Sequence, residues 1–396
     1  MLIAASSIIP ATAASSGVSP IFSPGYVAVA GGRITEVGSG PPPARPDIEL
    51  TSGFLVPGLV DLQVNGYFGV ELGDADPVGW AEVVRRLPET GATAFLPTFI
   101  TSPVDEMVTA LRATAGFAPG LTGSNGKPAG SRVLGVHLEG PFIAESRRGA
   151  HNPAWIISPD RQTVGELLTA GAGLVRMVTL APEIDGAIAA IRQLADAGVI
   201  ASVGHSDATA RQVAAAASAG ARLVTHIFNA QRPLHHREPG VVGQALTDSR
   251  LSSGLIADLH HVAGAIAGLA FRAAPGRIFL VTDATASAGM APGRYVLGGE
   301  PIDVTGADGT PPVRADGTLA GSALRMDMAI ANMVAVGIAL PDAVAAATRI
   351  PADLIGRPDI GRIEGAAAAD LTWLNDELTT TATWVSGSQV YGSSLG

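Results

Sequence analysis

Histidine, carboxylate and amide side chains gather in six short segments of this chain, each directly after a short apolar run. Imidazole nitrogen together with carboxylate oxygen is the ligand set of catalytic zinc, and it also suits iron or manganese. A metal held by three protein ligands keeps one position for water and lowers the pKa of that water from about 15.7 to about 7. The segments are 61–66, 137–141, 204–207, 225–230, 258–261 and 282–284.

The strongest candidates also have structural interpretations. His205 or His226, taken alone, is better explained as a packed histidine bonded to the backbone, whereas the pair at the ends of neighbouring strands favours a metal site. Glu139 precedes Gly-Pro and could cap a turn, but a carboxylate that ends an apolar strand is costly without a partner. Asp283 could equally be the N-cap of the next turn. A solvated loop would explain three further residues, His235, His236 and Arg237.

The hydrophobic pattern supplies elements that could bring the segments together. From residue 55 onward, short apolar runs alternate with helical patterns, as βαβ units do. The predicted strands are 59–64, 94–99, 133–138, 175–180, 200–204, 223–225, 254–257 and 278–282. The predicted helices between them are 77–87, 103–114, 185–197, 209–219 and 263–273. Eight such strands over roughly 250 residues fit an α/β fold of the (β/α)8 TIM-barrel type, in which all the strand ends lie on one face.

The sequence pattern also predicts strands near both ends of the chain, outside the alternation of strands and helices. They are 2–9, 26–30 and 33–38 near the N-terminus and 369–374, 381–385 and 388–390 near the C-terminus. We therefore expect a small β-sandwich domain built from both termini, residues 1–54 and 359–396, around a barrel domain at 55–358. Gly, Pro and Asp in residues 295–318 predict a β-hairpin insertion in the barrel. Two apolar helices are predicted after it, at 326–336 and 341–348.

Composition excludes several classes of protein. The 25 basic and 35 acidic residues give a net charge of −10, which argues against nucleic acid or an anionic membrane as a partner. There is no cysteine, so a disulfide framework, a thiolate metal site and a cysteine nucleophile are excluded. No apolar run is long enough to span a bilayer. The first basic residue is Arg33 and Pro10 interrupts the first apolar run, unlike a secretory signal, so we expect a cytoplasmic protein.

Taken together, the motifs resemble the amidohydrolase superfamily and, within it, the N-acetylglucosamine-6-phosphate deacetylase family. The resemblance covers nearly the whole chain, and six weak motifs in the family's order make it specific. It implies hydrolysis of the acetamide of N-acetylglucosamine 6-phosphate in amino-sugar catabolism and cell-wall recycling, or of a related sugar such as N-acetylgalactosamine 6-phosphate. A non-catalytic assembly protein of this fold would usually lack the ligand set. The motifs are 56–66, 137–141 with 149–153, 204–206, 225–230, 237–240 and 281–285.

The first-strand motif departs from most amidohydrolases, which carry a His-x-His pair there for a first metal. This chain has Gln63 and Asn65 at those positions, and amides are poor zinc ligands beside imidazole. The resemblance therefore implies one divalent metal per subunit, held by Glu139, His205 and His226. Zn²⁺ is the first choice, and Fe²⁺ or Mn²⁺ would also be compatible. It argues against the two-metal dihydroorotases and dihydropyrimidinases, because their strand-four lysine is missing as well.

The resemblance also assigns roles around the metal. Asp283 would be the general base and then the general acid, and His151 would stabilise the oxyanion. The phosphate would be bound by Arg237 and His261. Of the two adjacent histidines, we choose His261 rather than His260 from its register with the residues that follow it. Arginine and histidine of this kind can come from a neighbouring subunit, so the resemblance implies a homodimer with the phosphate site near its interface. Further substrate contacts are implied at Ala150, Asn229, Ala230, Ser322, Ala323 and Leu324.

Overall fold

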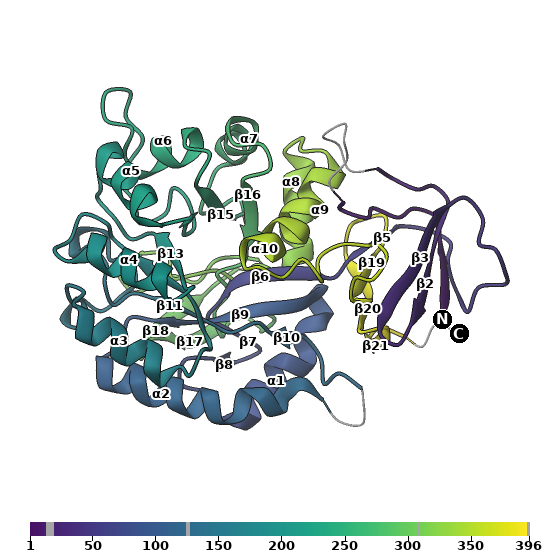
Figure 1. The fold of residues 1–396 in the computed structure, drawn as a ribbon, viewed down its shortest axis with the longest axis horizontal. Coiled ribbons are helices and arrows are strands. Elements are labelled where there is room, and N and C mark those ends of the chain that lie inside the picture. The colour runs from purple at the N-terminus through teal and green to yellow at the C-terminus, as the bar shows by residue number, and fades with distance from the viewer. Residues whose placement is uncertain (13–19, 124–126, 307–308, 394–396) are drawn as a thin grey trace.

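The computed structural model describes residues 1–12, 20–123, 127–306 and 309–393, and eight parallel strands of this part form a barrel (Figure 1). The strands neighbour one another in chain order, and an extra strand, β10 (Arg132–Val133), pairs with β9 outside the ring. The predicted TIM-type barrel is confirmed. The ring runs β6 (Leu59–Val64), β9 (Ala92–Ile100), β11 (Val136–Glu139), β12 (Val175–Leu180), β13 (Ile200–Val203), β14 (Leu223–Val224), β15 (Ser252–Ile256) and β16 (Ile278–Val281).

The ring closes between β16 and β6 through backbone hydrogen bonds just past the two strands. The amide of Asp283 donates to the carbonyl of Gln63 at 2.9 Å, and the amide of Asn65 donates to the carbonyl of Ala284 at 2.8 Å. The predicted strand 133–138 divides into β10 and β11 because the chain bends at Gly135, where φ is 131°. A Cβ on Gly135 would lie 2.3 Å from Cγ of Arg176, so only glycine fits this bend.

Helices cover the outside of the ring (Figure 1), and every helix predicted from the sequence is present. The sequence pattern missed α3, α6 and α10. Gly165 weakens the helical signal of α3, although Asp160 caps it by accepting from the amide of Thr163 at 2.9 Å. In α6, Gly243 packs against Pro239. The helices are α1 (Pro77–Arg86), α2 (Val104–Phe117), α3 (Arg161–Ala170), α4 (Ala187–Asp196), α5 (Ala210–Ala219), α6 (Gly240–Thr247), α7 (Gly264–Ala273), α8 (Met326–Ala335), α9 (Leu340–Ala347) and α10 (Arg349–Leu354).

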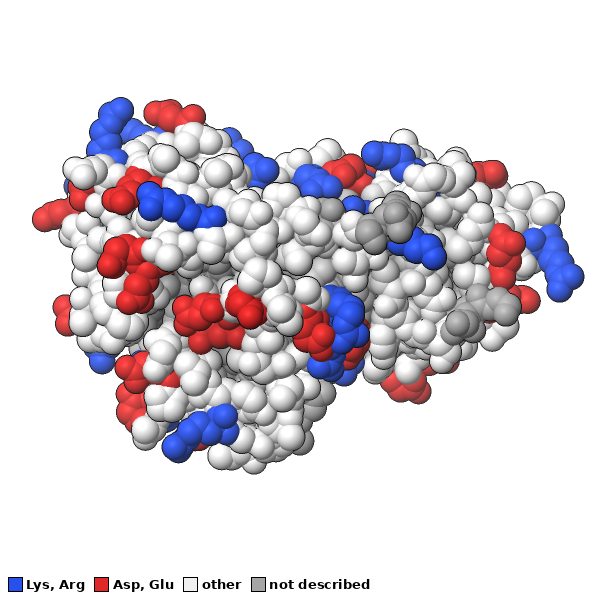
Figure 2. Space-filling view, turned by 90° about the horizontal axis from the view of Figure 1, so that it is seen from below, with Lys and Arg blue, Asp and Glu red and all other residues white. Residues whose placement is uncertain are grey.

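Short 3₁₀ turns and a two-stranded ribbon complete the connections of the barrel. The 3₁₀ turns are η1 (Leu87–Thr90), η2 (Ala118–Thr122), η3 (Glu145–Arg147) and η4 (Pro153–Trp155). The ribbon consists of β7 (Gly66–Tyr67) and β8 (Val70–Glu71). No helix among the described residues is long and apolar enough to cross a membrane. Figure 2 shows clusters of acidic side chains on the face of the barrel seen from below, as expected for a net charge of −10.

Two four-stranded sheets beside the barrel form the predicted β-sandwich from both chain termini (Figure 1). They share one apolar core, with Ile3 and Val27 from one sheet and Leu55 and Trp384 from the other. The predicted strand 2–9 ends early because the chain crosses between the sheets, so that Ile8 pairs with Leu55. The first sheet has β3 (Arg33–Ser39), β2 (Gly25–Ala30), β1 (Leu2–Ala5) and β4 (Ile48–Leu50), and the second β21 (Ser388–Tyr391), β20 (Thr380–Val385), β19 (Leu371–Leu374) and β5 (Phe54–Pro57).

A β-hairpin lies where the insertion was predicted, with β17 (Gly293–Leu297) paired antiparallel to β18 (Glu300–Val304). Its turn is Gly298-Gly299, and both glycines have positive φ, which a two-residue hairpin turn of this kind requires. Residues 307 and 308 of the predicted insertion lie outside the described residues. Leu297 and Ile302 of the hairpin pack against Ile100 and Ala150 of the barrel, so the hairpin is fixed over the end of the barrel.

An ion pair with a buried carboxylate and a partly exposed arginine joins the barrel to the second small sheet and gives a stability prediction. Arg132 binds Asp370 through two hydrogen bonds of 2.9 and 3.0 Å, and the side chain of Asp370 is fully buried. We expect Arg132→Ala to lower the free energy of unfolding by about 3 kcal/mol, because it leaves a buried carboxylate without its charged partner, with only the amide of Ser386, among the described residues, still donating to Oδ1. Arg85→Ala, at an exposed pair with Glu82, should cost less than about 1 kcal/mol. Equal shifts of the two urea midpoints would contradict this prediction.

Candidate active site

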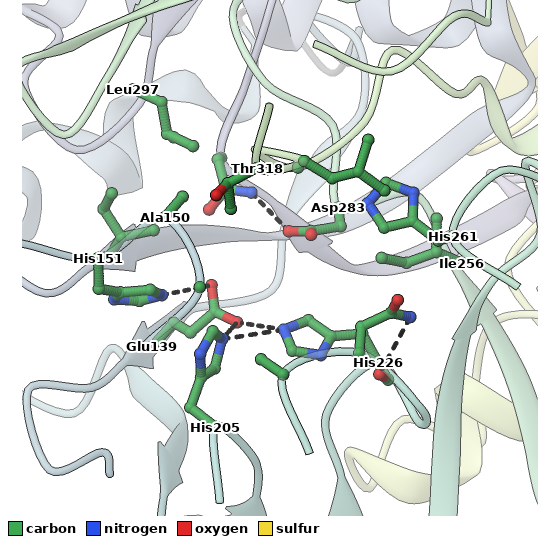
Figure 3. A pocket seen from close by; sticks show the side chains of 17 residues that line it. Glu139, Ala150, His151, His205, His226, Ile256, His261, Asp283, Leu297 and Thr318 are labelled. Carbon is green, nitrogen blue, oxygen red and sulfur yellow. Dashed lines mark hydrogen bonds and ion pairs between the residues drawn. The ribbon is translucent and has the colours of Figure 1, made fainter. Parts of the chain in front are cut away.

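The polar segments that follow the strands meet around one pocket at the carboxyl end of the barrel (Figure 3). Its volume is about 220 Å³, several times the roughly 30 Å³ that one water occupies, so it can admit an organic ligand. The predicted residues that line it are Asn65, Glu139, Ala150, His151, His205, His226, Asn229, Ala230, His261 and Asp283. Two more lining residues adjoin predicted segments, since Gly149 begins the motif 149–153 and Gly321 directly precedes the contacts predicted at 322–324. The sequence did not single out the remaining lining residues, Ile100, Ile256, Leu297, Thr318 and Leu319.

Glu139, His205 and His226 form the tightest cluster in this pocket. Oε1 of Glu139 lies 2.8 Å from Nε2 of His226 and 3.2 Å from Nε2 of His205, and the two nitrogens are 3.1 Å apart. In a tetrahedral zinc site, ligand atoms about 2.0–2.1 Å from the metal are about 3.3 Å from one another. The three atoms therefore have the chemistry and spacing of a metal-ligand set. A second group of three, with His151 in place of His226, has its ligand atoms within 4.8 Å of one another.

The backbone at the site is strained where it presents these side chains. His205, His226 and Asp283 each have a positive φ, at 47°, 26° and 53°. Such conformations cost non-glycine residues of order 1–3 kcal/mol each and concentrate at functional sites. Each of the three residues follows a barrel strand by two positions, so the turn at the strand end directs its side chain into the pocket.

The charges of the cluster depend on burial and on the contact between the carboxylate and the imidazoles. Burial disfavours the charge of Glu139, but hydrogen bonds from His205 and His226 outweigh burial and hold the pKa of Glu139 well below its usual range. Burial also disfavours a charged His226, yet its hydrogen bond to Glu139 and the nearby negative charge raise its pKa to about 9. The imidazole of His226 is therefore protonated near neutral pH. A metal that binds to His226 would have to displace this proton.

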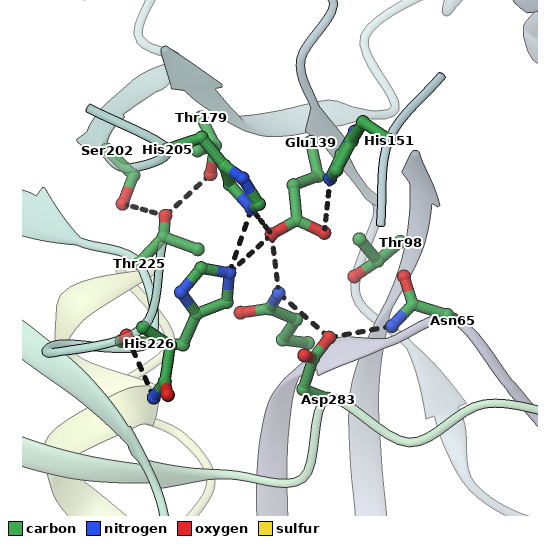
Figure 4. A network of polar contacts seen from close by, with 12 residues as sticks. Asn65, Thr98, Glu139, His151, Thr179, Ser202, His205, Thr225, His226 and Asp283 are labelled. Carbon is green, nitrogen blue, oxygen red and sulfur yellow. Dashed lines mark hydrogen bonds and ion pairs between the residues drawn. The ribbon is translucent and has the colours of Figure 1, made fainter. Parts of the chain in front are cut away.

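Gln63 and Asn65, the residues that the resemblance predicts in place of two metal-binding histidines, act as hydrogen-bond donors, as Figure 4 shows for Asn65. Nε2 of Gln63 lies 3.0 Å from Oε1 of Glu139 and 3.0 Å from Oδ1 of Asp283, and Nδ2 of Asn65 lies 2.7 Å from the same Oδ1. Burial and the charge of Glu139 raise the pKa of Asp283 to about 6. Gln63 thus lies between two buried carboxylates that repel each other and donates to both, while Asn65 donates to Asp283 alone. The sequence pattern alone did not reveal this task.

Asp61 lies beneath this pair and was noted in the sequence only as part of a motif. Its carboxylate accepts from the hydroxyl of Thr282 at 2.5 Å and from the amides of Thr282 and Gln63 at 3.2 Å each. Burial raises the pKa of Asp61 to about 7 despite these bonds. Because Thr282 precedes Asp283, Asp61 joins the two strand ends that carry Gln63 and Asp283.

Buried hydroxyls lie beside the cluster, those of Thr179, Ser202 and Thr225 (Figure 4), and together with Thr98 they form a belt around His137. The imidazole lies between Oγ1 of Thr98 at 3.2 Å and Oγ1 of Thr179 at 2.8 Å. Thr225 is 2.6 Å from both Thr179 and Ser202. Burial lowers the pKa of His137 to about 4, so the imidazole is neutral. The belt links five neighbouring strand ends and fixes their relative heights.

His151 reaches the cluster from the loop that follows β11. Its Nε2 lies 4.0 Å from Oε2 of Glu139, and its Nδ1 contacts the hydroxyl of Thr101 at 2.7 Å. The amide of Thr101 also donates to Nδ1 at 3.4 Å, which favours the tautomer with its proton on Nε2. Burial, with the nearby His205, lowers the pKa of His151 to about 3. A neutral imidazole therefore offers an N–H to the pocket.

His261 lines the far end of the pocket, whereas its neighbour His260 is exposed and lies outside the lining. Asp258 orients His261 through a contact of 2.6 Å to Nδ1 and through the backbone amide at 2.8 Å. Arg237 is exposed and outside this chain's pocket, with its guanidinium 3.0 Å from Nε2 of His236. The three predicted contacts that follow the lining residue Gly321 in the chain are buried: Ser322, Ala323 and Leu324.

The barrel and its buried carboxylate–imidazole pocket define a class of hydrolase, and comparison with known proteins agrees. The Amidohydrolase family model matches residues 54–390, so the chain belongs to the amidohydrolase family. It is an enzyme family that hydrolyses amides and related bonds with a bound metal, in keeping with the buried Glu/His/His group.

Within that family, the chain is similar over most of its length to N-acetylglucosamine-6-phosphate deacetylases. It is 38% identical to the enzyme of that name from Danio rerio, covering 87% of this chain and 86% of the relative. Identity to the enzyme of Homo sapiens is 39%, over 85% of this chain and 83% of the relative. The solved enzyme of Mycobacterium smegmatis, a D267A mutant in complex with N-acetyl-D-glucosamine 6-phosphate, is 36% identical with a TM-score of 0.90, covering 98% and 99% of the two chains.

The proton on His226 predicts how metal affinity depends on pH. Between about pH 7 and about pH 9, we expect the affinity of the metal-free protein for Zn²⁺ to rise roughly tenfold per pH unit, because binding releases that proton, and to level off above about pH 9. Calorimetric titration in two buffers of different ionisation enthalpy measures the release.

His226→Gln should weaken binding and flatten this slope, and His260→Gln, at an exposed position, should change neither. A wild-type affinity that is constant between about pH 7 and about pH 8.5 would contradict the prediction.

Proposed function

We propose that this chain hydrolyses the acetamide of N-acetylglucosamine 6-phosphate to glucosamine 6-phosphate and acetate, with one divalent metal per subunit. The observation that carries the proposal is the cluster of Glu139, His205 and His226 beside Asp283, in a chain 38–39% identical to enzymes named for this reaction. A cytoplasmic location stays a prediction from the sequence.

Glu139, His205 and His226 would hold the metal, with Zn²⁺ as the first choice and Fe²⁺ or Mn²⁺ also compatible. We prefer His226 to His151 as the third ligand because its Nε2 is 2.8 Å from the carboxylate of Glu139, against 4.0 Å for His151. When bound, the metal would supply an activated water and polarise the amide carbonyl. Gln63 and Asn65 support the assignment of a single metal, since their nitrogens donate to carboxylates.

Asp283 would move the proton. Gln63 and Asn65 both donate to its Oδ1, so the proton exchange falls to the other oxygen, Oδ2. With a pKa of about 6 in the metal-free pocket, the carboxylate is ionised near neutral pH and can accept a proton from water. It would then pass that proton to the nitrogen of the leaving amine, which departs as glucosamine 6-phosphate while the acyl carbon keeps the water oxygen as acetate.

His151 would stabilise the charge that develops on the carbonyl oxygen. Its neutral ring carries the proton on Nε2, which faces the pocket, and Thr101 holds the other ring nitrogen. A preorganised N–H aimed at a developing oxyanion stabilises the transition state more than the ground state.

Arg237 and His261 would bind the phosphate, which needs a local positive site in a chain of net charge −10. His261 lies in the pocket, whereas Arg237 does not line the pocket of its own chain. This arrangement supports a homodimer in which Arg237 serves the neighbouring subunit. Apolar residues are exposed on α7 and the loops beside α6 and α7, as an interface would require: Leu234, Leu259, Ile266 and Leu269.

A second candidate substrate is N-acetylgalactosamine 6-phosphate. The chain is 36% identical to an enzyme named N-acetylgalactosamine-6-phosphate deacetylase from Escherichia coli O157:H7, over 86% of this chain and 88% of that relative. Both sugars carry the same acetamide and phosphate, so comparison of kcat/KM on the two epimers decides between them.

Acetate release and metal content, measured on one sample, test the proposal. We expect activity on N-acetylglucosamine 6-phosphate with one metal per chain, loss of activity on chelation, and its return with zinc or iron. Asp283→Asn should lower kcat by about 10²–10⁴-fold with metal retained, because proton transfer is lost. Asp342→Asn, at an exposed aspartate, is the matched control. Bound metal without acetate release would overturn the proposed reaction, and two metals per chain would overturn the single-metal assignment.

The phosphate site is tested by Arg237→Ala. We expect kcat/KM to fall by about 10²-fold or more on the phosphorylated sugar and little on N-acetylglucosamine. Arg222→Ala, at an exposed arginine, should leave both unchanged. If Arg237 serves the partner subunit, mixing the Arg237→Ala and Asp283→Asn proteins restores activity in mixed dimers. Equal losses on both sugars would remove Arg237 from the phosphate site.

A further inference from the structure

The two ends of the pocket differ in chemistry (Figure 3). His261 lies at one end beside Ile256, and the polar Asn229 and the backbone of Ala230 are also in the lining. At the opposite end, beyond His151, the lining is apolar and consists of Ile100, Ala150 and Leu297. We call these three residues the apolar corner.

The apolar corner is a built wall, because the hairpin insertion packs onto the barrel there. Leu297 and Ile302 of the hairpin are buried in one small apolar cluster. Ile100 and Ala150 pack against this cluster. A Cβ on Gly298 would lie 2.5 Å from Cδ1 of Ile100, so the hairpin turn and the isoleucine are in close contact.

Hydrogen bonds hold the hairpin on both sides of the corner. The amide of Gly298 donates to Oε1 of Glu71 at 2.5 Å. On the other side, Arg314 donates from Nη1 to the carbonyl of Ala150 at 2.7 Å and lies 3.3 Å from Oε2 of Glu300. Two anchors on opposite sides restrict the outward movement of the wall, so its size limit is set by Leu297 and Ile100.

We propose that the apolar corner receives the acyl group of the substrate and limits it to two carbons. The inference rests on the proposed function. A sugar phosphate bound toward His261 must direct its acyl group to the opposite end of the pocket. With the carbonyl oxygen at His151, the acyl carbon that follows the carbonyl points into the corner, where an alkyl group loses no hydrogen bond on desolvation.

The space behind the corner supports the limit of two carbons. A second cavity, of about 30 Å³, shares Asn65 and Ile100 with the first and is also lined by Glu71 and Ser102. It has room for only one or two waters, and Ile100 lines both cavities. An acyl chain longer than acetyl would therefore meet Leu297 and Ile100 directly. Replacing either with a smaller residue should make room for one further methylene.

Kinetics on N-acetyl, N-propionyl and N-butyryl glucosamine 6-phosphate, with the metal-loaded protein, test the proposal. We expect wild-type kcat/KM to fall by about tenfold or more from acetyl to propionyl. Leu297→Ala should raise the propionyl-to-acetyl ratio at least tenfold, and the milder Ile100→Val should raise it in the same direction. Leu319→Ala, at a residue that directly follows the insertion and lines the same pocket outside the corner, should leave the ratio unchanged.

The outcomes separate the acyl site from the proposed function. No carboxylate released from any of the three sugars by wild-type protein would overturn both. Activity on acetyl with a ratio unchanged in Leu297→Ala and Ile100→Val would overturn the acyl site alone. A wild-type protein that accepts all three chains equally would do the same. If Leu297→Ala does not fold, Ile100→Val decides, because it removes a single methyl group.

Discussion

One carboxylate oxygen, Oε1 of Glu139, is the contact on which the site depends. In a buried setting it meets donors from three different strand ends, His205, His226 and Gln63. A buried carboxylate is stable only when such partners hold it, and their charges in turn depend on it. The pocket, the proton on His226 and the place for a metal all follow from the barrel bringing these strand ends to one point.

The layers beneath Glu139 explain how the barrel holds that point. Asp61 and Thr282 join the two strands at the seam of the ring, so the positions of Gln63 and Asp283 are set together. On the other side, His137 and the hydroxyls around it link the strands that carry Glu139, His205 and His226. Both arrangements satisfy their polar groups internally, which is the condition for polar residues in a barrel core.

The hairpin insertion gives the site a boundary that the barrel alone lacks. The barrel supplies metal-binding and proton-transfer groups, whereas Leu297 and the turn at Gly298 close one end of the pocket. Chemistry and selectivity are therefore carried by different parts of the chain. A change in the insertion can alter which acyl group fits while the groups around Glu139 stay in place.

The sequence by itself determined the barrel strands, the sandwich strands except β4 and β5, and the polar candidates, because apolar periodicity and strand-end histidines and carboxylates are local signals. It missed α3 and α6, since glycines such as Gly243 weaken a helical pattern that tertiary packing then restores. It also missed α10, a six-residue helix that directly follows α9. It also missed the apolar lining, because a leucine such as Leu297 has the same appearance in a core and in a pocket. Only the tertiary structure decided that Gln63 separates two carboxylates and that Arg237 lies outside its own pocket. Both depend on contacts between residues far apart in the chain, which no local pattern encodes.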